Sequence, residues 1–269
     1  MRTLLKRDLA ARIVFRALGI AILSTAISVS WGAVQIPQLV LRDSYDVFWQ
    51  FTTSPIALVT PILVSIASAY SFFEERMRRF TFSVIVARGR SDTYLLSKLV
   101  SALLLGFTVT GLPVLALFTV AHIIWPLLGN PFIDPSIYGM TTQEAHADAA
   151  TRVTYSELIH ISPWLFAVSY ATWVGFGGAV FAAGTVLALC TIQNAYFAFV
   201  VPFGLYLGET VAAALVDLPH WGLMSSAYPY GLTPVPALEG AAAMLAVALG
   251  LIVAWIARLA TASSFGASQ

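Results

Sequence analysis

Charged residues are scarce in this chain and make up only 10% of its 269 residues. A soluble domain carries about 25% charged residues, so this deficit, beside a hydrophobic content of 59%, predicts an integral membrane protein. The single cysteine, Cys190, excludes an internal disulfide and a cysteine-based metal site. No G-x-x-x-x-G-K-[ST] motif occurs, which excludes ATP binding through a P-loop. The net charge of +1 predicts no nucleic-acid partner.

Six apolar segments are long enough to cross a bilayer. A helix needs about 20 apolar residues to span the hydrocarbon, and the period-two alternation of barrel strands is missing from these segments. The sequence therefore predicts an all-α membrane protein with six transmembrane helices in a single transmembrane domain. The expected helices are residues 17–41, 55–73, 99–122, 164–190, 195–216 and 240–257.

The distribution of lysine and arginine predicts the orientation of these helices. With a cytoplasmic N-terminus, twelve of the 14 basic residues lie inside and only Arg42 and Arg152 lie outside. Basic residues concentrate in cytoplasmic loops, so we expect both termini and the loop 74–98 to be cytoplasmic. The loops 124–163 and 217–239 are then extracellular.

The first 16 residues mix five basic residues with Leu4, Leu5, Leu9, Ile13 and Phe15. Basic side chains can reach lipid headgroups while their apolar stems stay in the interface. We expect residues 1–16 to form an interfacial helix, with a basic tail that only orients the first span as the alternative. The charged region and the apolar run after it are both longer than in a typical signal peptide.

The loop 74–98 has the pattern of a helix, a break and a second helix. Phe82, Ile85, Val86 and Gly89 fall near one helical face, with arginines elsewhere. Glycine readily takes the left-handed conformation that ends a helix. A short helix that lies along the membrane and offers Phe82 and Val86 to a groove is typical of a docking element.

The stretch FFEERMRRFTFSVIVARGRSDTYLLSKLVSALLL resembles the cytoplasmic loop of type-2 ATP-binding-cassette (ABC) exporter permeases. In that family acidic residues end span two, a coupling helix and a small-residue turn follow, and a Tyr and a Lys open span three. The six spans and the long connection between spans five and six are similar too. The matching coupling residues here are Glu74, Glu75, Arg79, Phe82, Val86, Arg88, Gly89 and Lys98.

This resemblance implies a permease subunit of a bacterial plasma-membrane exporter. It implies a dimer with a second permease subunit, identical or not, on two separate nucleotide-binding ATPase subunits that hold ATP and Mg. The chain itself would need no cofactor and no catalytic residue. In the alternative interpretation, the loop 74–98 only anchors the chain by its positive charge.

Two other functions compete with transport. Glu74-Glu75-x-x-x-Arg79 and Phe118-x-x-x-His122 resemble motifs of glutamate-type intramembrane proteases, in which a carboxylate activates water. No H-x-x-x-N-like motif accompanies them, and the predicted topology places Glu74 and His122 about 30 Å apart on opposite membrane faces. A non-transporting immunity or scaffold protein would share the topology without an ATPase partner.

Several polar residues in or near the spans are candidates for a substrate path or a gate. Glu209 is the one acid placed within a span, and intramembrane carboxylates are costly and often functional. Its alternative role is to accept a structural hydrogen bond near the outer interface. Ser28, Trp31 and Gln35 suggest an amphipathic cargo such as a peptide, a drug or a lipid-like molecule. Tyr228 lies in a loop broken by Pro and Gly, which by the resemblance forms an outer gate.

Two local patterns predict a helix start and close helix packing. Thr141-x-x-Glu144 is a capping box that starts a helix reaching about Ile159. Small residues recur at every fourth position in spans four and six and predict close helix packing within the chain. They are Gly175, Ala179 and Ala183 in span four, and Ala242, Ala246, Gly250 and Ala254 in span six.

Overall fold

A computed structural model of the protein describes residues 11–77, 91–152, 157–229 and 237–266. The regular structure in these ranges is helical, beside one isolated bridge between Leu41 and Ile133, so the all-α class is confirmed. The longer helices are α2 (Ala11–Gln35), α3 (Ser44–Thr52), α4 (Ile56–Ser68), α5 (Tyr70–Met77), α7 (Ser91–Thr119), α9 (Thr142–Arg152), α11 (Pro163–Thr191), α12 (Ala195–Leu215) and α14 (Ala237–Gly266). The shorter pieces are η1 (Ile36–Gln38), the π-helical η2 (Val120–Ile124), α8 (Trp125–Leu127), η3 (Pro135–Tyr138), α10 (Glu157–Ile161), η4 (Pro219–Trp221) and α13 (Leu223–Ala227).

The chain is a multi-pass, all-helical membrane protein. In the part that the structure describes, five helices are long and apolar enough to cross a bilayer, and a sixth span forms if α3 and α4 are counted together. These two helices are bent by 58° at the break between Thr52 and Ile56. The five continuous spans are Ile13–Gln38, Thr93–Leu127, Pro163–Thr191, Ala195–Leu215 and Leu238–Arg258.

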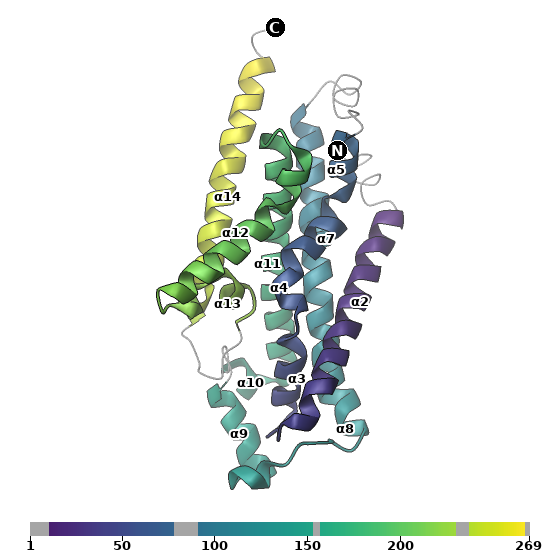
Figure 1. The fold of residues 1–269 in the computed structure, drawn as a ribbon, viewed down its shortest axis with the longest axis vertical. Coiled ribbons are helices and arrows are strands. Elements are labelled where there is room, and N and C mark those ends of the chain that lie inside the picture. The colour runs from purple at the N-terminus through teal and green to yellow at the C-terminus, as the bar shows by residue number, and fades with distance from the viewer. Residues whose placement is uncertain (1–10, 78–90, 153–156, 230–236, 267–269) are drawn as a thin grey trace.

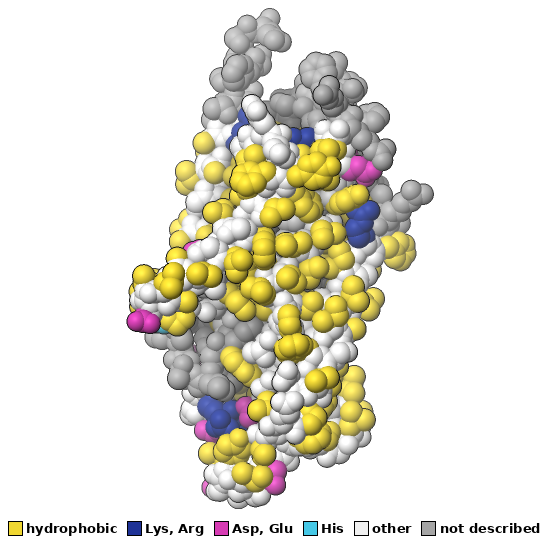
Figure 2. Space-filling view, in the orientation of Figure 1, with side chains coloured by type: hydrophobic (Ala, Val, Ile, Leu, Met, Phe, Trp, Pro, Cys, Tyr) yellow, Lys and Arg dark blue, Asp and Glu magenta, His cyan; other side chains and the backbone are white. Residues whose placement is uncertain are grey.

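The helices form an elongated bundle in which α7 and α11 run side by side (Figure 1). The start of α2, the end of α5, the start of α7 and the end of α14 lie at one end of the bundle, here called the α5–α7 end. The helices α8, α9 and α10 lie towards the other end, here called the α9 end. Apolar side chains cover the middle of the visible face, and most charged side chains lie towards the two ends (Figure 2).

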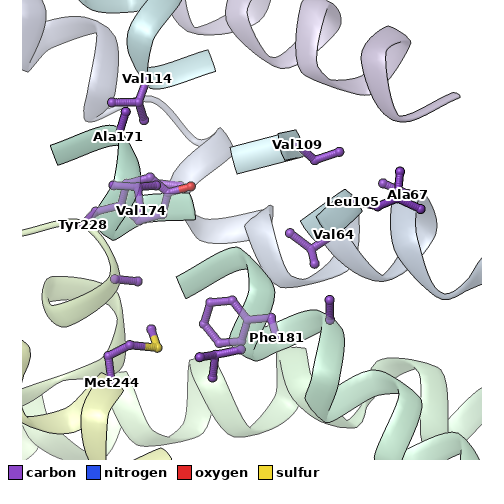
Figure 3. Packing of buried hydrophobic residues seen from close by; sticks show 14 of the residues in the cluster. Val64, Ala67, Leu105, Val109, Val114, Ala171, Val174, Phe181, Tyr228 and Met244 are labelled. Carbon is purple, nitrogen blue, oxygen red and sulfur yellow. The ribbon is translucent and has the colours of Figure 1, made fainter. Parts of the chain in front are cut away.

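Glycines let α7 and α11 approach very closely. A Cβ atom built on Gly106 would lie 2.6 Å from the carbonyl oxygen of Gly178, and one on Gly178 would lie 2.5 Å from that of Gly106. Around this contact the core is filled by aliphatic and aromatic side chains from α4, α7, α11 and α14 (Figure 3). Gly175 packs against the Phe107 ring, so the stripe in span four packs within the chain at this position as predicted.

The stripe in span six behaves differently from the prediction. Ala246 and Gly250 are exposed, and a Cβ atom on Gly250 would meet nothing within 4 Å. The side chains of α14 that pack against the bundle lie at other positions, and they include Ala241, Met244 and Trp255. The expected close packing of this stripe within the chain is therefore wrong at Ala246 and Gly250.

The segment between the first two predicted spans, to which the sequence analysis assigned no element, forms the helix α3. Asp43 starts α3 by accepting hydrogen bonds from the backbone N–H groups of Tyr45 and Asp46, which is a common way to begin a helix. Val47 and Phe51 of α3 are fully buried, so the helix belongs to the core. The sequence missed α3 because its charged start reads as a polar loop.

The capping box at Thr141 is confirmed. The Thr141 backbone N–H and hydroxyl donate to the Glu144 carboxylate, and the Glu144 backbone N–H donates to the Thr141 hydroxyl. The helix that it starts, α9, ends at Arg152 rather than near Ile159. The predicted interfacial helix at the N-terminus, up to residue 10, lies outside the described residues.

Candidate functional site

An ion pair joins the two ends of the loop 74–98. The Lys98 ammonium on α7 lies 3.0 Å from a carboxylate oxygen of Glu75 on α5, and the Lys98 side chain is only 2% exposed. The Tyr94 hydroxyl, one turn earlier on α7, donates to the other carboxylate oxygen of Glu75. Phe72 packs edge-on against the Tyr94 ring. These contacts hold the end of span two against the start of span three.

Arg76 ties the same end of α5 to the link between α11 and α12. Its guanidinium donates to the carbonyl oxygens of Leu189, Ile192 and Gln193. The last carbonyl groups of a helix have no partner within that helix, and a positive charge also complements the helix dipole at this end. Arg76 therefore stabilises the C-terminus of α11, a role that the sequence analysis did not assign to it.

Only some of the predicted coupling residues lie within the described part of the chain. Glu75 and Lys98 form an ion pair, and Glu74 precedes Glu75 on α5. The remaining members of the set lie outside the described residues. They are Arg79, Phe82, Val86, Arg88 and Gly89.

A cavity rich in hydroxyl groups lies at the break between α3 and α4. It is a narrow cavity of about 30 Å³ between α2, α4 and α7, partly open to the outside. The Ser28 hydroxyl lies 2.7 Å from that of Ser54, and the Thr60 hydroxyl lies 2.6 Å from that of Tyr228. Buried hydroxyl pairs of this kind satisfy each other's hydrogen bonds in an apolar surrounding.

The structure brings some of the predicted path residues together and separates others. Ser28 and Tyr228 both line this cavity, although they come from opposite ends of the sequence. Trp31 and Gln35 are on the same helix as Ser28 but are not among the residues that line it. Trp31 is 42% exposed on the outside of the bundle.

Glu209 accepts a structural hydrogen bond. Its carboxylate lies 2.5 Å from the backbone N of Leu223, and the neighbouring Thr210 hydroxyl accepts from the N–H of Met224. The two side chains therefore satisfy the first N–H groups of the short helix α13, which no residue of α13 itself caps. This agrees with the alternative role of Glu209, with a partner on α13.

Glu209→Ala is expected to lower the free energy of unfolding by about 1 kcal/mol, as for a lost helix cap. Glu209→Gln keeps an acceptor oxygen at the same place and should change stability by less than half as much. Thermal unfolding of the purified protein in detergent measures both. If Glu209→Gln were as damaging as Glu209→Ala, the negative charge rather than the hydrogen bond would be what the fold needs.

Tyr206 satisfies a carbonyl group that a proline leaves open. Pro61 lies inside α4 and has no N–H to donate to the carbonyl oxygen of Ala57, four residues before it. The Tyr206 hydroxyl on α12 donates to that oxygen at 2.9 Å, and the Tyr206 side chain is fully buried. The half-span α4 is therefore hydrogen-bonded both to Tyr206 of α12 and to Tyr228.

A charged network at the α9 end joins α9 to the start of α3. The Arg152 guanidinium is 3.1 Å from Asp43, 2.6 Å from Asp46 and 2.6 Å from Asp148, and Arg42 lies 3.0 Å from Asp148. These residues come from segments about 100 positions apart in the sequence. The network fixes the α9 segment onto the bundle and holds the only two basic residues predicted to lie outside.

Asp43→Asn is expected to remove a pH dependence of stability. Burial raises the pKa of the Asp43 carboxyl above its ordinary value of 3.8, and Asp46 raises it further, against the lowering effect of the backbone N–H groups and Arg152. The folded chain therefore binds this proton more tightly than the unfolded chain, so the Asp43 contribution to stability falls as the pH rises from 3.8 through the folded pKa. Asparagine is a good helix cap and does not titrate, so the stability of the variant should lack this pH dependence.

Unfolding of wild type and Asp43→Asn between pH 4 and pH 7 measures this difference, with Asp43→Ala as the control. Alanine removes the same titration but also the cap of α3, so it should be less stable than asparagine by about 1 kcal/mol at every pH. Parallel pH profiles for wild type and Asp43→Asn would contradict the prediction.

The protease-like motifs are far apart in the structure. His122 follows Lys98 by 24 positions on the continuous helical segment of α7 and η2, which is about 36 Å at 1.5 Å per residue. Since Glu75 contacts Lys98, it cannot share a reaction site with His122 in this arrangement. Among the described residues, no group of three or more His, Cys, Asp or Glu side chains is placed to hold a metal ion.

Comparisons with protein-family models, with curated proteins and with solved structures found no match to this chain.

Proposed function

We propose that this chain is the membrane-spanning permease subunit of an ABC exporter of the type-2 class. ATP would be hydrolysed by a separate nucleotide-binding subunit, and the cargo would be an amphipathic molecule such as a peptide, a drug or a lipid-like compound. The chain would act in the plasma membrane of a bacterium as one of two permease subunits. Its own role is conformational, so we assign it no catalytic residue.

The observation that carries this proposal is the way in which the ends of the loop 74–98 are held. Glu75 is bonded to Tyr94 and Lys98 of α7, and Arg76 is bonded to the link between α11 and α12. A push on the loop that follows α5 would therefore reach α7, the end of α11 and the link to α12 through direct polar contacts. An element that only oriented the protein by its charge would not need such connections.

The chemistry of the hydroxyl-rich cavity supports the choice of an amphipathic cargo, although this cavity of about 30 Å³ must widen before it can admit one. Its lining alternates hydroxyl groups such as Ser28 and Thr60 with aliphatic side chains such as Leu63 and Val109. It is bounded by α4, which is broken from α3 and bonded to Tyr206 and Tyr228. Movement of α5, which directly follows α4, would change the shape of this cavity. In this scheme the ATPase changes transport only because its nucleotide states differ in affinity for the permease conformations.

Affinity purification of the full chain from mild detergent tests the proposal. We expect a nucleotide-binding subunit to co-purify stoichiometrically with the wild type and to be lost from Phe82→Asp/Val86→Asp, because charges on the docking face would be buried unpaired. The matched control is Leu128→Asp/Ile137→Asp, which adds the same charges to exposed apolar positions at the α9 end and should leave co-purification unchanged.

Recovery of the wild-type chain alone under conditions that preserve membrane complexes would overturn the proposal. The immunity or scaffold alternative would then remain. Loss of the ATPase from both double variants would mean that the added charges damage the fold, and thermal unfolding of each variant distinguishes that outcome from a lost docking face.

A further inference from the structure

A second, apolar groove lies between α11, α12 and α14. It has a volume of about 270 Å³ and is lined almost entirely by aliphatic and aromatic side chains, with Thr191 at one end. Gly184 lies in its lining, where an added Cβ atom would meet only Leu251 at 3.8 Å and Pro202 at 4.0 Å. All three helices are membrane-spanning segments, so the groove opens where lipid chains surround the protein.

The length of the groove matches one leaflet of a bilayer. On α11 the lining runs from Val180 to Thr191, which is about 17 Å at 1.5 Å per residue. One leaflet is half of a hydrocarbon core that is about 30 Å thick. An extended acyl chain is therefore the ambient molecule whose shape and chemistry fit this space.

Two arginines mark the end of the groove at Thr191. Arg76 donates to the carbonyl oxygens of Ile192, which lines the groove, and of Gln193. Arg258 follows Leu251 by seven positions on α14, so both lie on the same helical face, two turns apart.

Trp255 adds an unsatisfied donor between the groove and Arg258. It lies one turn after Leu251 on the same face of α14, and its side chain is 6% exposed. Its indole N–H is buried and has no hydrogen-bond partner among the described residues. Buried polar groups are nearly always bonded, so an acceptor is expected to approach this N–H, one turn beyond the last residue of α14 that lines the groove.

We propose that this groove binds one anionic phospholipid from the leaflet at the α5–α7 end of the bundle. One acyl chain lies along α11 between α12 and α14, the Trp255 N–H donates to an ester or phosphate oxygen, and Arg258 faces the phosphate beside Arg76. Arginine suits this role because its planar guanidinium forms strong charge-assisted bonds with phosphate. The proposal stands on this groove alone and does not depend on the exporter function.

Native mass spectrometry of the purified full chain tests the site, with phosphatidylglycerol and phosphatidylcholine of identical acyl chains as probes. We expect the wild type to retain phosphatidylglycerol in preference to phosphatidylcholine. Arg258→Gln should reduce that preference by about tenfold, the effect of one lost charge-assisted hydrogen bond. Trp255→Phe should weaken binding of both lipids.

Gly184→Leu fills the groove and should remove binding of both lipids at this site. Its control is Gly250→Leu, an identical change on α14 where nothing lies within 4 Å, which should bind like the wild type. Equal melting temperatures for the two variants show that both are folded. Equal lipid binding by Gly184→Leu and Gly250→Leu, or a headgroup preference that Arg258→Gln does not change, would overturn the proposal. So would a change of oligomeric mass in Gly184→Leu without a change in lipid binding, because a second copy of the chain would then fill the groove.

Discussion

Replacing Gly178 with alanine is expected to lower the free energy of unfolding by about 3 kcal/mol, the upper range for overpacking a core. The added Cβ atom would lie 2.2 Å from the Thr110 hydroxyl oxygen and 2.5 Å from the carbonyl oxygen of Gly106. The carbonyl belongs to the backbone of α7 and cannot rotate away, so α7 and α11 would have to separate. The Thr110 hydroxyl would also lose its hydrogen bond to the carbonyl oxygen of Val174.

Thermal unfolding in detergent measures this loss, and Gly204→Ala is the matched control. Gly204 lies in the middle of α12, where an added Cβ atom meets nothing within 4 Å. Alanine favours helix over glycine by up to about 1 kcal/mol, so the control should be unchanged or slightly more stable. Equal melting temperatures for the two variants would mean that α7 and α11 can separate at little cost.

The spans of this protein could be predicted from the sequence, whereas the contacts between them could not. Length and apolar character identify α2, α7, α11, α12 and α14 because the bilayer requires about 20 such residues. The Gly106–Gly178 contact escaped prediction, since regular spacing of small residues within one helix does not say which helix lies opposite. The same limit explains the stripe of α14, where Gly250 turned out to be exposed.

Two features carried a signal that the sequence analysis left unused. A proline at position 61 always leaves the carbonyl oxygen at position 57 without its helical donor, so a hydroxyl partner such as Tyr206 was to be expected. Arg42 and Arg152 were the only bases predicted to lie outside, among several acids. Their pairing with Asp43, Asp46 and Asp148 follows from opposite charge, although the choice of partners comes from the fold.

The sequence identified two residues of the candidate site, Glu75 and Lys98, but not the contact between them. The resemblance singled out Glu75 and Lys98 by their positions around the loop, but only an antiparallel α5 and α7 bring them to 3.0 Å. Arg76 drew no attention because it lies among other arginines. Its function depends on the carbonyl groups at the end of α11, more than 100 positions away in the sequence.

Glu75→Gln is expected to lower the free energy of unfolding by about 3 kcal/mol, because it removes the carboxylate charge that lies 3.0 Å from the buried ammonium of Lys98. Lys98→Met should cost less, since the Glu75 side chain is 24% exposed and can be solvated by water, whereas Lys98 is only 2% exposed. This difference between the two single variants follows from the greater cost of desolvating Lys98. The control is Glu239→Gln, which removes a charge from an exposed position on α14.

The double variant Glu75→Gln/Lys98→Met separates charge from packing. Replacing both members of a buried pair is often close to neutral, so the double variant should be more stable than Glu75→Gln alone, and the four melting curves form a double-mutant cycle. Additive losses would show that the two side chains do not interact. If the double variant regains stability but still fails to co-purify with an ATPase, the pair transmits force as well as stabilising the fold. If it regains both stability and co-purification, the role of the pair is to hold α5 against α7.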